Sequence, residues 1–321
     1  MKKTAVFLMN LGGPRNLAEV EPYLYELFAD PLVVTAPFGP FRPLFAKLIS
    51  KLRAPSSSEK YQLIGGRSPL VEGTEAQARA LQELLGPDFT VQLAMRCGHP
   101  NTQEGIRAAL AAGAEQAISL PLYPQFANAT TTSSLREMRR LWPREKPLFE
   151  VCSYPDHPRY LEASAAALRD AIARVKPENR GKLLVVFSAH GLPMSQVNKG
   201  DPYPEEIGRS ARGTAERAGV KEYQVTYQSK VGPAKWLGPD TSQWLEASSR
   251  GRAVVTHPLA FVSEHLETLY DMDMLAAQAA RKGGALEYHR AAAVGVHPEF
   301  MGALADLVRF TLERAVPAPR G

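Results

Sequence analysis

The chain has 321 residues, of which 45% are hydrophobic, and this length predicts two domains rather than one hydrophobic core. Its 38 basic and 33 acidic side chains leave a formal charge of +5, far from the concentrated basic surface that nucleic-acid binding requires. We therefore expect no DNA or RNA partner.

The cysteines and the N-terminus indicate a cytoplasmic protein. Only Cys97 and Cys152 occur, without the spacing of a zinc site, a redox pair or an iron–sulfur motif. The start Met1-Lys2-Lys3 precedes an apolar run that stops at Asn10 with no cleavage pattern, so it predicts a strand rather than a signal peptide. No window reaches the roughly 18 uncharged residues of a spanning helix, so the chain can at most touch a membrane surface.

Short β-rich runs alternate with longer helical segments, which is typical of parallel sheets joined by crossover helices. In the first half we predict strands over residues 4–10, 90–96, 117–122 and 148–153. In the second half we predict strands over residues 182–188, 224–228, 253–257 and 286–292. Each half is expected to form one small doubly wound sheet.

Proline and charge gather at residues 142–147, so the domain boundary is predicted near residue 150, giving lobes 1–150 and 151–321. A last helix is predicted over 298–316 and is expected to pack back across a lobe. Its apolar residues recur at helical spacing: Met301, Leu304, Leu307, Val308 and Leu312.

Polar residues follow several predicted strands in glycine- and proline-rich turns. Loops at the carboxyl edge of an open parallel sheet face a common crevice, where ligands bind. These loops are Asn10-Leu11-Gly12-Gly13-Pro14, Ser188-Ala189-His190-Gly191-Leu192-Pro193, Gln228-Ser229-Lys230-Val231-Gly232-Pro233 and Phe261-Val262-Ser263-Glu264-His265-Leu266-Glu267.

Plain turn chemistry is the alternative explanation of these loops, and for Gly12-Gly13 it is preferred because a dinucleotide spacing and a Walker lysine are missing. His190 differs from the glycines, because it lies directly at the end of a buried strand. A buried imidazole there is costly unless it is satisfied or used.

The acidic stretch after Ser263 is the most informative segment. If Ser263 caps a helix, Glu264, Glu267 and Asp271 fall on one face at i, i+3 and i+7. The helix dipole explains acids in a first turn but not Asp271. Because like charges on one face repel, we interpret the stripe as a track for protons or cations. Hydrolase motifs such as GxSxG and HExxH do not occur in the chain.

These loops together resemble those of the ferrochelatase family, which inserts ferrous iron into porphyrin at the end of haem synthesis. The matching stretches run in the family's order over nearly the whole chain. Besides the loops above they are Gly65-Gly66-Arg67-Ser68-Pro69-Leu70, Leu122-Tyr123-Pro124-Gln125-Phe126, Gly200-Asp201-Pro202-Tyr203-Pro204, Trp236-Leu237-Gly238-Pro239 and His265-Leu266-Glu267-Thr268-Leu269-Tyr270.

The resemblance implies an α/β fold of two similar Rossmann-like lobes, each a small parallel sheet flanked by helices, with a cleft between them. It implies His190 and Glu267 as the iron-binding and catalytic pair, facing each other across the cleft, with Asp271 in a proton or metal relay behind Glu267. Porphyrin would be bound by Arg53, Arg96, Phe126, Ser229, Lys230 and Trp236.

The chain departs from the family pattern in its porphyrin pocket and in its number of cysteines. Cys97 stands where many members have an aromatic residue, and Phe126 where many have tyrosine, which puts a pocket hydroxyl in doubt. Some relatives carry a cysteine-rich cluster segment that two cysteines cannot supply. We expect no iron–sulfur cluster and no prosthetic group, with ferrous iron as substrate.

Metal insertion requires a bent macrocycle and an acceptor for two inner protons. His190 titrates near neutral pH and suits that acceptor, while Glu267 and Asp271 could pass protons outward or deliver the cation. Arg53 and Lys230 are candidate partners of the anionic propionates. Candidate apolar walls are Phe38, Phe41, Leu44, Phe45, Phe126 and Trp236.

A lip over the pocket is expected at about residues 32–55. Its stretch 37–53 mixes apolar side chains with Arg42, Lys47, Lys51 and Arg53, so it is either a peripheral membrane contact or an ordinary amphipathic surface helix. We expect a monomer, cytoplasmic or peripheral at the inner face of the membrane.

Three alternatives stay open at this point. Another divalent metal such as cobalt could be inserted into a related tetrapyrrole, because nitrogen donors do not select iron by affinity alone. The chain could instead be a non-catalytic porphyrin or haem carrier, although a carrier needs no acidic track. Protoporphyrin and coproporphyrin are both candidate substrates, and the stretch Lys230-Val231-Gly232-Pro233 looks more like the protoporphyrin users.

Overall fold

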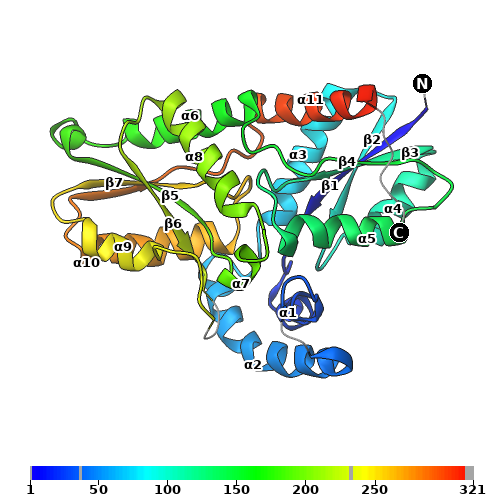
Figure 1. The fold of residues 1–321 in the computed structure, drawn as a ribbon, viewed down its shortest axis with the longest axis horizontal. Coiled ribbons are helices and arrows are strands. Elements are labelled where there is room, and N and C mark those ends of the chain that lie inside the picture. Colours follow the sequence, from blue (N-terminus) through cyan, green and yellow to red (C-terminus); the bar gives the residue numbers. More distant parts are fainter. Residues whose placement is uncertain (1, 36–37, 231–233, 315–321) are drawn as a thin grey trace. The chain divides into compact units, whose positions relative to one another are not determined.

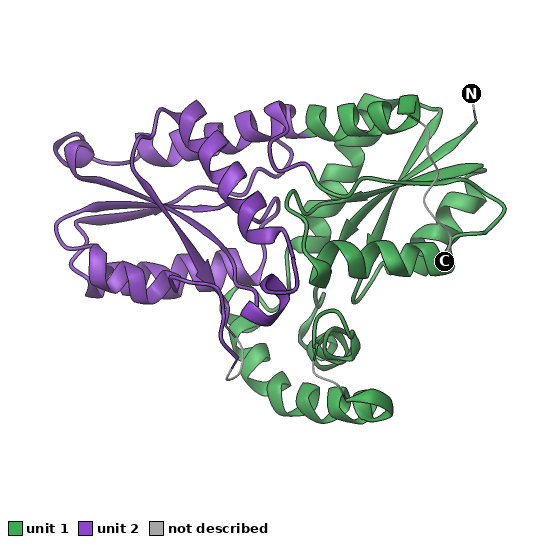
Figure 2. Ribbon diagram, viewed as in Figure 1, with its two compact units in different colours: residues 1–153, 301–321 green, residues 154–300 purple. Residues whose placement is uncertain are grey.

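A computed structural model describes residues 2–35, 38–230 and 234–314, and the chain divides into two compact units (Figures 1 and 2). Unit 1 runs to Ser153 and takes up the chain again at Met301, whereas unit 2 is Tyr154–Phe300. Each unit contains one parallel sheet of four strands.

The sheet of unit 1 has the order β2-β1-β3-β4. Its strands are β1 (Thr4–Asn10), β2 (Phe89–Met95), β3 (Gln116–Pro121) and β4 (Leu148–Glu150). Every residue of β1 is buried, as expected for a central parallel strand covered on both faces. The sheet is flanked by α3 (Leu70–Leu85), α4 (Thr102–Ala111) and α5 (Ser133–Leu141).

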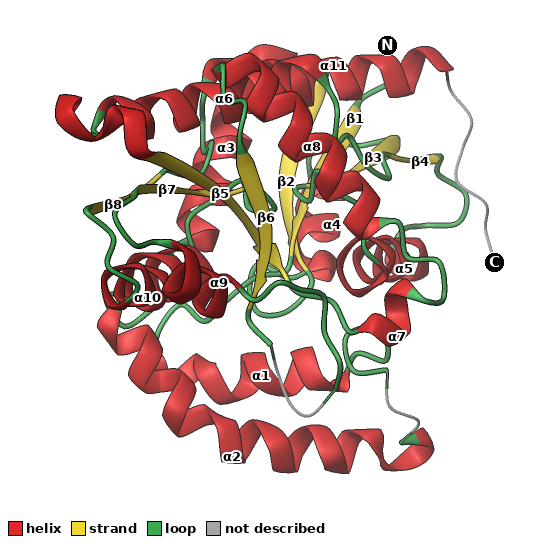
Figure 3. Ribbon diagram, turned by 60° about the vertical axis from the view of Figure 1, so that its left-hand side comes forward, coloured by secondary structure: helices red, strands yellow, loops and turns green. Residues whose placement is uncertain are grey.

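Unit 1 also carries a pair of helices between β1 and α3. Helix α1 (Val20–Ala29) lies beside the longer α2 (Arg42–Leu63), as Figures 1 and 3 show. Short 3-10 turns, η1 (Leu17–Glu19) and η2 (Gly39–Phe41), precede the two helices. The predicted lip at residues 32–55 therefore corresponds largely to η2 and the first turns of α2, while positions 36 and 37 lie outside the described residues.

Unit 2 repeats the arrangement with the strand order β6-β5-β7-β8. Its strands are β5 (Leu183–His190), β6 (Tyr223–Gln228), β7 (Ala253–Pro258) and β8 (Glu287–Arg290). Helices α6 (Pro158–Ala173) and α8 (Tyr203–Ala218) cover one face of the sheet, and α9 (Thr241–Ser248) and α10 (Ala277–Lys282) cover the other (Figure 1). Two short helices, η4 (Pro177–Lys182) and α7 (Met194–Val197), flank β5 in the chain.

The predicted fold class is confirmed, because each lobe is a helix-flanked sheet of four parallel strands. All of the predicted strands are present with ends shifted by a few residues. Gly12 has a φ of 91°, and a Cβ there would lie 1.8 Å from the Cys97 carbonyl oxygen, so both its backbone and its surroundings require glycine. The predicted cleft between the lobes stays a prediction.

A π-helix follows the third strand of each sheet, which sequence patterns do not reveal. In unit 1, η3 (Asn128–Thr132) follows β3 and runs into α5. In unit 2, η5 (Glu267–Ala276) follows β7 and runs into α10. Wide helical turns of this kind are rare and often occur at functional sites.

The last described helix, α11 (Pro298–Arg314), joins unit 1 from Met301 onward. Arg309 donates a hydrogen bond of 3.0 Å to the Leu84 carbonyl in α3. The predicted end of this helix at Val316 lies outside the described residues. Among the helices that the structure describes, none is long and apolar enough to cross a bilayer.

Candidate active site

His190 and Glu267 meet at the carboxyl edge of the unit 2 sheet. His190 is the last residue of β5, and its Nδ1 lies 2.7 Å from Oε2 of Glu267, the first residue of η5. The side chain of His190 is 38% exposed and that of Glu267 is 23% exposed. The pair is therefore held by the fold yet open to a ligand from one side.

Ser229 connects Glu267 to a second carboxylate. Its Oγ lies 2.9 Å from Glu267 Oε2 and 2.6 Å from Asp271 Oδ2. A hydroxyl carries one proton, so it donates to one carboxylate at a time unless the other is protonated. The three groups thus form a chain along which a proton can be exchanged.

The backbone of Ser229 is strained to make this contact. Its φ of 64° is the only positive value at a non-glycine position within the described chain. A left-handed conformation costs a side-chain-bearing residue about 1–2 kcal/mol, and such strain gathers at functional sites. The strained turn directly after β6 is what lets one hydroxyl reach both carboxylates.

Gln228, which the sequence did not single out, anchors the start of the π-helix. Its side chain is buried, donates 2.9 Å to the backbone carbonyl of Glu267 and accepts 2.6 Å from Ser188 Oγ. The amide therefore ties β5 and β6 to the first turn of η5. Its place at a strand end next to Ser229 is the one sequence signal that could have indicated this role.

The predicted acidic stripe of three residues is wrong at its first member. The helix begins after His265, whose N–H donates 3.0 Å to Thr268 Oγ1, so Ser263 does not cap it. Glu264 precedes the helix and binds Arg290 instead. Glu267 and Asp271 do share a face, because the i→i+5 bonding of a π-helix brings residues four and five apart to the same side.

The charges of the pair reinforce each other. Burial raises the pKa of Glu267, but the charge and hydrogen bond of His190 outweigh it, so the pKa of Glu267 falls to about 2. Burial lowers the pKa of His190, but the charge and hydrogen bond of Glu267 outweigh it and the pKa of His190 rises above 6.5. Glu267 is thus ionised at neutral pH, and His190 holds a proton more readily than free histidine.

The geometry leaves Nε2 as the available nitrogen of His190. Nδ1 is held by Glu267, and Nε2 has no hydrogen bond from the described part of the chain. A histidine that binds a metal through one nitrogen usually donates the other N–H to a carboxylate, which fixes its tautomer and orientation. The pair has this arrangement.

A closed metal site is not present among the described residues, since no cluster of three or more His, Cys, Asp and Glu side chains there could hold an ion. His190 and Glu267 offer two donor groups. A site that must release its metal suits such a sparse set better than a tetrahedral cage.

Trp236 and Lys230 belong to the loop after β6. Trp236 forms an antiparallel bridge with Pro193, and a Cβ at Gly191 would lie 3.3 Å from its Cε3 atom. The indole thus lies against the turn that follows His190. Lys230 is 3.4 Å from Asp240, and Val231-Gly232-Pro233 lie outside the described residues.

The other predicted pocket residues belong to unit 1. Arg96 is bound to the buried Asp30 at 2.6 Å and to Ser133 at 2.7 Å, beside a pocket of about 320 Å³. Arg53 is exposed on α2, and Phe126 is half-buried in the loop between β3 and η3. Within unit 2, the structure brings His190, Glu267, Asp271 and Ser229 into one hydrogen-bonded group. The roles of the remaining residues stay predictions.

Cys97 is buried in unit 1, next to Arg96 in the chain, and burial raises the pKa of its thiol to about 12. A thiol of that kind stays protonated at neutral pH and is a poor nucleophile or metal ligand.

Comparison with solved structures places the fold among the chelatases. SirB from Bacillus subtilis with Fe3+ is similar with a TM-score of 0.59 at 16% identity, over 96% of this chain and 95% of that one. CbiX, the terminal enzyme for biosynthesis of siroheme in denitrifying bacteria, is similar with a TM-score of 0.51 at 14% identity, over 98% and 100%. The two parallel-sheet lobes are thus the fold of two-lobed metal chelatases.

Sequence comparison gives the family. The Ferrochelatase family model matches residues 3–312. The ferrochelatase of Geotalea uraniireducens (strain Rf4) is 38% identical over 97% of this chain and 98% of its own length. That of Synechococcus sp. (strain RCC307) is 41% identical over 97% and 83%. The chain belongs to the ferrochelatase family, metal-chelating lyases of haem biosynthesis.

Proposed function

We propose that the chain inserts ferrous iron into a porphyrin, with release of two protons, and that His190, Glu267 and Asp271 carry the reaction. Family membership supports the activity. The observation that supports the residue roles is the 2.7 Å contact between His190 Nδ1 and Glu267 Oε2. Porphyrin and ferrous iron are the substrates, without an iron–sulfur cluster or another prosthetic group.

His190 Nε2 is the proposed iron-binding atom. Glu267 holds the ring through Nδ1, and its Oε1, which has no hydrogen bond from the described chain, is the second candidate donor. Binding of iron to Nε2 displaces its proton, because a metal ligand must be deprotonated. When the ion moves to the macrocycle, Nε2 is free to accept one pyrrole proton while Nδ1 gives its own proton to Glu267; once Glu267 has passed that proton on, the second pyrrole proton leaves by the same route.

Asp271 and Ser229 provide the proposed exit for protons. The Ser229 hydroxyl lies within hydrogen-bond distance of both carboxylates, so a proton reaching Glu267 can be handed on to Asp271. General acid–base steps of this kind typically contribute about 10²–10⁴-fold to a rate. Neither cobalt insertion nor a carrier role is needed to explain the site.

Protoporphyrin is the proposed porphyrin, held by Arg53, Arg96, Phe126, Ser229, Lys230 and Trp236. Its apolar faces suit Trp236 and Phe126, and its propionates suit the guanidinium and ammonium groups. Arg96 is already paired with Asp30, so a propionate would have to share that guanidinium.

The test is an anaerobic assay with ferrous iron and each free-base porphyrin, following loss of the free-base spectrum. The protein should turn over protoporphyrin faster than coproporphyrin. His190→Ala should abolish insertion while porphyrin still quenches tryptophan fluorescence on binding. Near-normal turnover in His190→Ala would remove His190 from the mechanism, and faster turnover of cobalt than of iron would contradict the assignment of the metal.

A membrane contact through α2 is the second part of the proposal. Four apolar side chains at helical spacing are exposed on η2 and α2: Phe41 at 70%, Leu44 at 67%, Leu48 at 60% and Leu52 at 67%. Lys47, Lys51 and Arg53 lie on the same helix and can meet anionic headgroups. The same stripe could instead face a bound porphyrin, as a lip.

Co-sedimentation with liposomes separates these uses of the stripe. A Leu44→Gln, Leu48→Gln double variant should lose binding to anionic vesicles while keeping its KM for porphyrin. Unchanged sedimentation would defeat the membrane contact, and a raised KM would favour the lip. The proposed cytoplasmic location and monomeric state are tested by cell fractionation and by analytical ultracentrifugation.

A further inference from the structure

Arg290 is the most highly connected side chain next to the candidate site that no function described so far uses. It is the last residue of β8 and its side chain is only 11% exposed. Its Nε and Nη2 donate to the two carboxylate oxygens of Asp273 at 2.7 and 3.0 Å. Its Nη1 donates to Glu264 Oε1 at 3.0 Å and to the Ala291 carbonyl at 3.0 Å.

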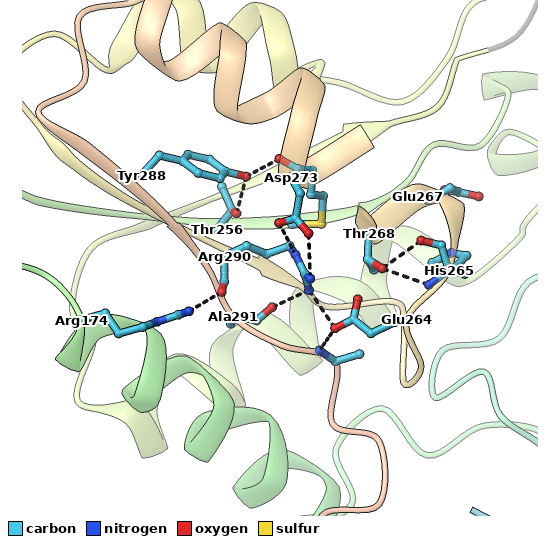
Figure 4. Close-up of polar contacts among 12 residues, drawn as sticks. Arg174, Thr256, Glu264, His265, Glu267, Thr268, Asp273, Tyr288, Arg290 and Ala291 are labelled. Carbon is cyan, nitrogen blue, oxygen red and sulfur yellow. Dashed lines mark hydrogen bonds and ion pairs between the residues drawn. The ribbon is translucent and has the colours of Figure 1, made fainter. Parts of the chain in front are cut away.

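The two carboxylates that Arg290 binds lie on either side of Glu267 and Asp271 in the chain. Glu264 precedes the π-helix, and Asp273 lies two residues after Asp271 within it. Figure 4 shows both turned toward the Arg290 guanidinium, whereas Glu267 points away from it. The Arg290 guanidinium therefore links the two ends of the segment 264–273. We call Arg290 with Glu264 and Asp273 the clamp.

Neighbouring groups reinforce this clamp. Glu264 Oε1 also accepts 2.9 Å from the backbone N–H of Ala293. Tyr288, two residues before Arg290 on β8, donates 2.7 Å to the Met272 carbonyl in the π-helix (Figure 4). Residues two apart in a strand face the same side, so one face of β8 holds consecutive residues of η5.

Two of the four carboxylates in the segment 264–273 bind Arg290, and the other two bind residues of the candidate site. Arg290 neutralises Glu264 and Asp273, and burial of Glu264 is outweighed by the Arg290 charge, which keeps its pKa below the usual value. Glu267 and Asp271 are left facing His190 and Ser229. Without that cation, four like charges would repel within ten residues of the chain.

We propose that Arg290 is a positioning residue for metal insertion: by binding Glu264 and Asp273 together, it fixes the π-helix where Glu267 meets His190 and shares Ser229 with Asp271. The inference rests on the proposed roles of His190 and Glu267. A π-helix has fewer favourable backbone contacts than an α-helix and relies on tertiary contacts to keep its shape. Side chains that orient metal ligands are typically worth about 10–100-fold in affinity or activity.

The test compares Arg290→Met with Arg252→Met in the full chain. Arg252 is a matched control, because it donates to the carbonyls of Lys182 and Leu183 in unit 2 and is not bonded to any of the four site residues. Both variants should lower the Tm. Only Arg290→Met should speed hydrogen–deuterium exchange of the η5 backbone amides, Glu267–Ala276, and reduce kcat about 10–100-fold with little change in the porphyrin KM.

Asp273→Asn provides a milder second variant, because Asp273 is 39% exposed and its loss removes one half of the clamp. It should speed amide exchange in η5 and lower kcat in the same direction but by less. The proposal is overturned if Arg290→Met and Asp273→Asn keep the wild-type exchange protection of η5, whatever their activity. Amide exchange reports on the π-helix without turnover, so it stays informative even if His190 proves dispensable for insertion.

Discussion

The two units share one scaffold and differ in what its carboxyl edge carries. Their sheets have the same strand order, and the third strand of each leads into a π-helix. The second-position strand ends in Asn10 in unit 1 and in His190 in unit 2. The π-helix opens with Asn128 in unit 1 and with Glu267 in unit 2.

The two units thus have the same backbone arrangement at this edge but different side chains. Both units place a strand end and a π-helix start at corresponding points of the chain, and in unit 2 these two points are in contact. In unit 1 these places hold neutral amides, and Asn10 bonds the Leu11 N–H and Thr74. In unit 2 they hold the His190–Glu267 pair, which is the proposed site for the cation and the proton. The shared fold provides the position, and the residue types at that position determine whether it can carry acid–base chemistry.

After the loss of insertion expected for His190→Ala, the largest effect is expected at Glu267. Glu267→Gln keeps the side-chain shape but removes the charge that holds the pKa of His190 above 6.5, so kcat should fall by at least about 100-fold. The matched change in unit 1, Asn128→Ala, should leave kcat within about threefold of wild type. An equal loss of kcat in Glu267→Gln and Asn128→Ala would contradict the view that only unit 2 carries the chemistry.

Ser229 should affect activity more than stability. Ser229→Gly relieves the left-handed strain at φ 64°, which offsets the loss of its side-chain hydrogen bonds, so the free energy of unfolding should change by less than about 1 kcal/mol. It also removes the bridge between Glu267 and Asp271, so kcat should fall about tenfold. Calorimetry and steady-state kinetics measure the two changes. A fully active and more stable variant would leave the strain without a function.

The His190–Glu267 pair should contribute to stability only within a pH window. The pKa of Glu267 is depressed, so its contribution is complete above 4.5 and is lost as the pH falls toward 2. The pKa of His190 is raised, so its contribution is complete below 6.5 and is lost as the pH rises through the folded-state value.

A double-mutant cycle with His190→Ala and Glu267→Gln measures this coupling by urea unfolding. It should be greatest between about pH 4.5 and 6.5, and at most about 1 kcal/mol because the pair is partly exposed to solvent. A coupling that grows steadily up to pH 9 would contradict the assigned charges.

The smallest effect is expected in the π-helix of unit 1. The Thr131 hydroxyl is buried and finds no hydrogen-bond partner among the described residues. Thr131→Val should therefore be neutral or stabilise by up to about 1 kcal/mol, with kcat unchanged. A marked loss of activity would mean that unit 1 contributes more to the chemistry than its neutral side chains suggest.

Prediction from the sequence succeeded where the signal was local. The strands of both sheets were predicted because apolar runs bounded by Gly and Pro are read directly from the chain. The pairing of His190 with Glu267 came from the family resemblance; the structure shows their side chains in contact, and their roles stay predictions. The acidic stripe failed at Glu264, because the helix starts only at Leu266, where the His265 N–H donates to the Thr268 hydroxyl of the first turn.

By itself, the sequence determined the α/β class, the doubled architecture and the family, since these follow from periodicity and from motifs in order along the chain. Only the tertiary structure decided which carboxylates serve His190 and which serve Arg290. Those partners lie 17 to 77 residues apart in the chain, and their pairing depends on distances that no local pattern contains.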